Sequence, residues 1–173
     1  MGEKRRNQTR GSSLLEFTLI GIPTICILII TFEMARGMWT YHTLAYAVKG
    51  GVRYAVVHGQ DCALPPNNCT VTIGQIASVV RTSGVGLPAD LVKLRFTDAA
   101  GTPTACTLSD CIANYTSSAW PPTVANAPGQ DVRISGTFPF RSAMLMFWPG
   151  VGGPAARPGV INLSADSREG IQF

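Results

Sequence analysis

The sequence predicts an α+β protein: a long N-terminal membrane-spanning α-helix, then a small domain with one short helix and an antiparallel sheet of about four strands. Three observations predict this class. An apolar run near the N-terminus is long enough to cross a bilayer. It continues without a break into a helical apolar stripe. Beyond residue 60, short alternating segments separated by Gly and Pro are typical of strands and turns.

The composition excludes several function classes. Of the 173 residues, 14% are charged and 46% are hydrophobic, which argues against disorder. The net charge of +4 comes mainly from residues 1–11, which hold four basic side chains and one acidic one. Residues 60–173 hold equal numbers of each sign. A nucleic-acid partner needs basic charge clustered on the folded body, so we expect none.

Residues 12–33 form the predicted transmembrane helix. Between 12 and 32 the only charge is Glu16. About 20 apolar residues at ~1.5 Å each span a hydrocarbon core of ~30 Å. The basic leader keeps the N-terminus in the cytoplasm, so we expect a single-pass protein of the cytoplasmic (inner) membrane with its C-terminal domain outside. The alternative is a cleaved signal peptide, but no convincing cleavage site of that kind follows the apolar run.

Glu16 is the unusual residue of this segment, because a carboxylate inside a bilayer costs on the order of 3 kcal/mol. Two interpretations remain open. Glu16 lies among the lipid headgroups and snorkels, or it has a partner. If the chain is cut after Gly11, Ser12 becomes a new N-terminus with a charged amine at neutral pH. In a packed array of such helices, Glu16 of one subunit would neutralise the Ser12 ammonium of the next.

The order of basic leader, Gly11, Glu16 and apolar helix resembles a type IV prepilin processing site. The closer resemblance is to the TadE-like family, pseudopilins of tight-adherence pilus systems. The matching residues are Arg10, Gly11, Leu15, Glu16, Phe17, Pro23, Glu33, Ala35, Arg36, Gly37, Ala47, Gly51, Arg53, Tyr54 and Ala55. Departures are Met34, Lys49 and Gly50. The resemblance is dense over residues 1–60, looser over 131–170 and absent between them.

The resemblance implies a pilin-like fold and a function in assembly. A prepilin peptidase would cut the Gly11–Ser12 bond. Other pilin or pseudopilin subunits and the pilus assembly platform would be the partners, in a tight-adherence (type IVc) pilus or a related secretion machine. The alternative is a permanently anchored envelope protein with a small binding or adhesion domain. Neither interpretation needs a cofactor or a small-molecule substrate.

Residues 34–59 extend the helix beyond the membrane. An apolar stripe at helical spacing predicts one continuous helix from 12 to 58, about 70 Å long; its members are Tyr41, Leu44, Ala45, Val48, Val52, Ala55 and Val56. Pro23 removes a backbone donor and predicts a kink. A second stripe consists of the small residues Ala47, Gly51, Ala55 and Gly59. It favours close packing, either between subunits or against a neighbouring element of the same chain.

Residues 60–173 are the predicted small extracytoplasmic domain. Residues 70–83 have the pattern of a short amphipathic helix, ended by Gly84 and Gly86. Strands are predicted at 91–98, 102–108, 132–140 and 160–165, with Gly136 marking a bulge. The proline-rich segment 120–130 reads as a loop. Laying the sheet on the C-terminal half of the long helix buries both apolar faces.

Five cysteines divide by location. Cys26 lies in the membrane segment, where a thiol behaves as a small hydrophobe. The other four lie in the predicted extracytoplasmic domain, where disulfides form. Local pairing of Cys62 with Cys69 and of Cys106 with Cys111 is favoured over crossed pairing. A four-cysteine zinc site is the weaker alternative, because its usual spacing is shorter.

The sequence contains no recognisable catalytic motif, so we do not expect an enzyme. The two histidines, His42 and His58, both lie on the long helix. Nucleophile-elbow, phosphate-loop and zinc-protease motifs do not occur. Residues 84–89 resemble a dinucleotide turn only superficially, because they follow a helix and contain Pro88. The apolar run 144–149 is expected to be buried core, or else a contact surface for a pilus partner or the membrane.

Overall fold

The computed structural model describes residues 9–58, 71–142 and 160–172, and all structural statements concern these ranges. The predicted fold class is confirmed: a long N-terminal helix, short helices and a four-stranded antiparallel sheet. The elements in chain order are α1 (Thr9–Val56), α2 (Ile73–Ser83), β1 (Lys93–Thr97), β2 (Pro103–Thr107), α3 (Leu108–Asn114), the 3₁₀ turn η2 (Thr123–Ala125), β3 (Asp131–Arg141) and β4 (Val160–Gly170).

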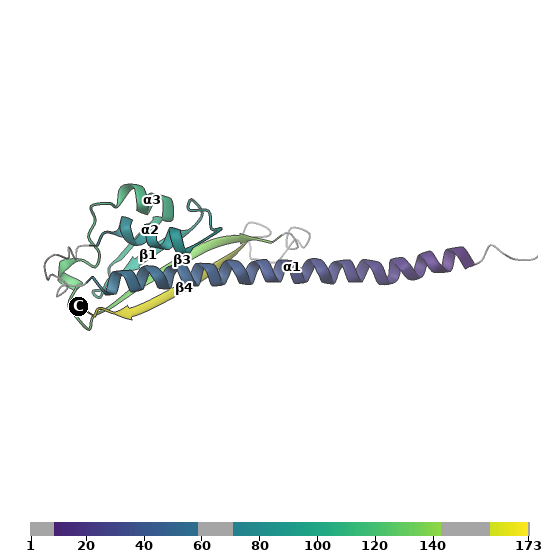
Figure 1. Ribbon diagram of the computed structural model, residues 1–173, viewed down its shortest axis with the longest axis horizontal. Coiled ribbons are helices and arrows are strands. Elements are labelled where there is room, and N and C mark those ends of the chain that lie inside the picture. Colours follow the sequence, from purple (N-terminus) through teal and green to yellow (C-terminus); the bar gives the residue numbers. More distant parts are fainter. Residues whose placement is uncertain (1–8, 59–70, 143–159, 173) are drawn as a thin grey trace, which may run out of the picture.

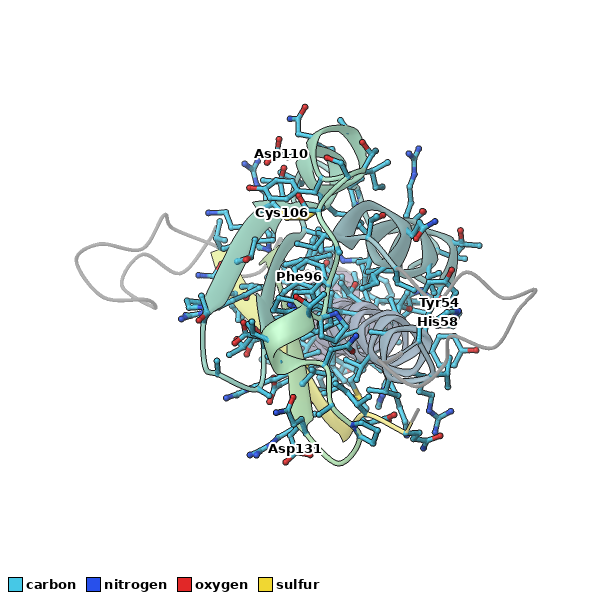
Figure 2. The ribbon with its side chains drawn as sticks, turned by 90° about the vertical axis from the view of Figure 1, so that its left-hand side faces the viewer. Tyr54, His58, Phe96, Cys106, Asp110 and Asp131 are labelled. Carbon is cyan, nitrogen blue, oxygen red and sulfur yellow. A yellow bond between two sulfur atoms is a disulfide. The ribbon has the colours of Figure 1, made fainter. Side chains whose placement is uncertain are left out.

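The sheet has the strand order β2-β1-β3-β4, and every neighbouring pair is antiparallel. The C-terminal half of α1 lies along one face of β3 and β4, α2 packs against α1, and α3 packs against α2. Figure 1 shows that the N-terminal half of α1 extends well beyond this body. Seen along α1, the helices occupy one side of the body and the sheet the other, with Phe96 in the interior between them (Figure 2).

The core lies where the end of α1 meets the sheet. The side chains of Leu44, Val48, Val52 and Val56 come from four successive turns of α1 and are almost completely buried. They face a sheet surface built from Leu94, Phe96, Val132 and Ile134, all equally buried. The helical stripe is therefore confirmed over these turns, whereas Tyr41, at its N-terminal end, is exposed. Residues 44–56 thus belong to the folded body as much as to the helical extension.

Helix α2 shows how a local signal fixes an element boundary. The Thr72 hydroxyl accepts a hydrogen bond from the Gln75 amide at 3.3 Å, and the Gln75 side chain accepts one from the Thr72 amide at 3.0 Å. This capping box satisfies two amides that the first turn leaves without helical partners. Ile76 and Val80 then point into the core, as the amphipathic pattern predicts.

Three features differ from the sequence-based prediction. Helix α3 was missed, because the strand predicted to end at 108 stops at Thr107, which caps a helix by accepting from the Asp110 amide. Strand β4 continues to Gly170, five residues past its predicted end. The prediction of a bulge at Gly136 is wrong, because Gly136 pairs in regular register with Leu94 and Ala165. Gly136 instead permits close approach of α1, since a Cβ there would lie 2.8 Å from Val48 Cγ2.

Ion pairs tie β3 to β4. Arg133 Nε donates to Asp166 Oδ1 at 2.6 Å, and Arg168 donates to Asp131 at 2.7 Å. The hydrogen bond to Asp166 raises the pKa of the Arg133 guanidinium above its ordinary value, so Arg133 stays charged at any physiological pH. At the end of α1, Arg53 lies 3.6 Å from Glu169 of β4.

Candidate membrane and assembly interface

The N-terminal half of α1 is apolar and has nothing packed against it within the described chain. It contains a window of mean hydropathy 2.2 whose residues are all unburied, so α1 is long and apolar enough to cross a membrane. Its large exposed side chains are Leu14, Leu15, Phe17, Leu19, Ile20, Ile22, Ile25, Ile27, Leu28, Ile29, Ile30 and Phe32. An apolar surface this long is not stable in water, and a bilayer or neighbouring helices would cover it.

Between Leu14 and Phe32, where the structure describes the side chains, the hydroxyl groups are satisfied inside the helix. Thr18, Thr24 and Thr31 each donate a hydrogen bond to the carbonyl oxygen four residues earlier, at 3.1, 2.7 and 2.8 Å. Such bonds remove the cost of placing a hydroxyl in hydrocarbon. The helix therefore presents no unpaired threonine donor between Leu14 and Phe32.

The predicted processing site lies at the start of α1. The helix begins at Thr9, so the backbone of Gly11 and Ser12 is already helical. Glu16 is exposed one turn later and forms no ion pair with any described residue. Pro23 lies within α1, which runs through it as one element (Figure 1). The kink and the Glu16 pairing remain predictions.

The small-residue stripe packs within the chain where the structure describes it. Ala47, Gly51 and Ala55 are all buried. A Cβ on Gly51 would lie 2.7 Å from Val80 Cγ2 and 3.3 Å from Ile76 Cγ2, both of α2. The small residues on α1 thus let α2 approach closely, the second of the two interpretations of this stripe. Gly59 lies outside the described residues.

The junction between the apolar half and the body was not found from the sequence. Arg36 pairs with Glu33 at 3.1 Å, and its guanidinium lies 4.7 Å from the centre of the Phe140 ring. It also donates a hydrogen bond to the Arg141 carbonyl oxygen. The end of β3 is thereby held against α1 just past Phe32, the last residue of the uncharged run. Residues 36 and 140 are over a hundred positions apart, so no local pattern predicts their contact.

Three of the five cysteines lie in the described part of the chain. Cys106 and Cys111 form a disulfide, with Cα atoms 5.5 Å apart, which confirms the local pairing here and rules out a zinc site that uses both thiolates. Figure 2 shows Cys106 beneath α3. Cys26 is exposed and free on the apolar part of α1. Cys62, Cys69 and the run 144–149 lie outside the described residues.

No protein-family model, curated protein or solved structure matches the chain. Within the described ranges, no group of His, Cys, Asp and Glu side chains is arranged to hold a metal ion. The interface is therefore defined by its physical chemistry alone. It is an apolar helix without a cover, carrying one carboxylate near its start and a folded body at its end.

Proposed function

We propose that the chain is a minor pilin-like subunit of a tight-adherence pilus or a related secretion machine, and that it acts by helix packing after its leader is removed. The observation that carries this proposal is the division of α1. One half is buried in the body, and the other is apolar and uncovered. A single rigid helix of this kind can leave a bilayer and enter a bundle of similar helices without refolding the body.

Glu16 supports the assembly role. It is exposed on an otherwise apolar surface, so it would be an unpaired charge in either a bilayer or a helical bundle. After cleavage, the Ser12 ammonium of a neighbouring subunit supplies the missing opposite charge. The pair would also fix the axial position of each subunit relative to the next, because only one stagger brings the two charges together.

The mature N-terminus tests the proposal. In cells with an active prepilin peptidase, mass spectrometry of the intact protein should show a chain that begins at Ser12. Gly11→Arg should block cutting, because a bulky charged side chain cannot enter a site shaped for glycine. Gly2→Arg adds the same charge to the leader away from the bond and should be cut normally. A wild-type chain that keeps residues 1–11 in such cells contradicts the proposal.

One observation favours the permanent-anchor alternative. The backbone is already helical from Thr9, and a helical peptide bond must unwind before a protease can cut it. A permanent anchor needs no such step. It predicts an uncut chain that stays in the membrane fraction and does not co-purify with pilins. The experiment above separates the two functions.

A further inference from the structure

A groove of about 830 Å³ lies beside the membrane-proximal end of the body. It exists because β1 begins at Lys93, opposite Thr137, whereas β3 continues to Arg141 and leaves a notch at the corner of the sheet. Pro139 lies in this overhang, where the absence of an N–H costs no bond to β1. Helix α1 closes the notch on one side with Arg36 and Trp39.

The described lining of this groove is basic. Arg36, Lys93 and Arg141 line it, and no acidic side chain does. Arg36 shares its charge with Glu33, but Lys93 and Arg141 form no ion pair with any described residue. On the other flank of Phe140, a second groove of about 590 Å³ is almost wholly apolar and is lined by Glu33. Of these two grooves, only the first, with its basic side chains, suits an anion.

The position of the groove along α1 identifies the kind of anion. Arg36 follows Phe32 by four residues, and Thr40, also in the lining, by eight. At ~1.5 Å per residue they lie about 6 and 12 Å beyond the last uncharged residue of the span. The headgroup region extends roughly 5–8 Å beyond the hydrocarbon on each side. The Arg36 end of the groove therefore lies at headgroup level, and Trp39, 70% exposed, belongs to a residue type that prefers membrane interfaces.

We propose that this groove binds the phosphate headgroup of an anionic phospholipid in the outer leaflet. Guanidinium groups bind phosphate oxygens through paired, charge-assisted hydrogen bonds, and Lys93 adds a point charge. The apolar part of the lining, with Phe138 and Pro139, suits the glycerol and upper acyl region. The inference rests on the membrane anchoring in the proposed function, but not on leader cleavage or on pilus assembly.

Native mass spectrometry tests this binding. The full-length chain in neutral detergent is mixed with equal amounts of phosphatidylglycerol and phosphatidylcholine of identical acyl chains. We expect preferential retention of phosphatidylglycerol. Lys93→Gln together with Arg141→Gln should lower that retention by about fivefold for each cation removed, since each basic side chain near a membrane surface contributes about 1 kcal/mol.

The matched control is Arg81→Gln together with Arg95→Gln, which removes the same charge from exposed positions outside the groove and should leave retention unchanged. Equal retention of the two lipids by the wild-type chain would overturn the proposal, and so would an equal loss in the control variant. Displacement of the lipid by millimolar inorganic phosphate would show a free-phosphate site instead. If the chain is uncut in cells yet retains phosphatidylglycerol, only the proposed function fails.

Discussion

At the scale of single residues, glycine matters most where two elements need to touch. Gly50 and Gly51 are adjacent on α1 and have equal intrinsic helix propensity, but their surroundings differ. A Cβ on Gly51 would be 2.7 Å from Val80 Cγ2, whereas a Cβ on Gly50 meets only Ser83 Oγ, at 3.5 Å. The sequence shows two neighbouring glycines, and only the packing of α2 separates their roles.

This contrast gives a paired prediction. Gly51→Ala should lower the free energy of unfolding by about 1–3 kcal/mol, because the new methyl group forces α2 away from α1. Gly50→Ala should be neutral or raise it by up to about 1 kcal/mol, because alanine favours the helix and fits the space. Denaturant unfolding of the full-length chain in detergent, followed by circular dichroism, measures both. Equal effects of the two substitutions would show that α2 does not pack on Gly51.

At the scale of elements, local signals decide where helices start. Thr72 and Gln75 form both hydrogen bonds of a capping box, and the Thr107 side chain caps α3 with a single hydrogen bond from the Asp110 amide. Both signals are readable in the sequence. Neither was used in the prediction: α2 was predicted to begin at residue 70 rather than at Ile73, and the cap of α3 lies at the end of a segment that was predicted to be a strand.

We expect Thr72→Ala to lower stability by about 1 kcal/mol, within the 0.5–2 kcal/mol typical of a lost N-cap. Thr82 is the matched control: it lies in the last turn of α2, and its exposed hydroxyl donates only to the Ser78 carbonyl of the same helix. Thr82→Ala should change stability by less than about 0.5 kcal/mol. The comparison uses the midpoint of thermal unfolding for each variant, and a Thr82→Ala loss as large as that of Thr72→Ala would argue against the cap.

At the scale of the whole molecule, α1 has two environments. From Leu44 onward it is the central helix of the body, at Arg36 and Gly37 it lies against Phe140 of β3, and before residue 33 it is uncovered by the described residues (Figure 1). Changes in the uncovered part should therefore alter assembly and leave the fold of the body intact.

Glu16→Ala tests this separation. Since Glu16 contacts no described residue of the body, the variant should have the wild-type expression level, leader cleavage and unfolding midpoint. Loss of its carboxylate leaves the neighbour's Ser12 ammonium unpaired, which typically costs ~3–5 kcal/mol. We expect loss of piliation and of co-purification with other pilins, with partial recovery in Glu16→Asp. Abundant pili in Glu16→Ala cells would contradict the ion pair and show that Glu16 only snorkels to the lipid headgroups.

The sequence by itself determined the long helix, its apolar and amphipathic parts and most strand positions, and it favoured the pairing of Cys106 with Cys111. These features depend on spacing within a few residues, so periodicity and local geometry are enough to predict them. The motif around Gly11 and Glu16 also came from the sequence, and its role still depends on the experiments above.

Tertiary structure alone decided the strand order, the contact of Arg36 with Phe140 and the basic groove at the corner of the sheet. It also decided that Gly136 pairs regularly within the sheet and lies against Val48 of α1. Each of these joins residues that are far apart in the chain, and their positions depend on how helices and strands pack. A sequence pattern specifies which face of an element is apolar, but the opposing element is chosen only when all the faces are buried together.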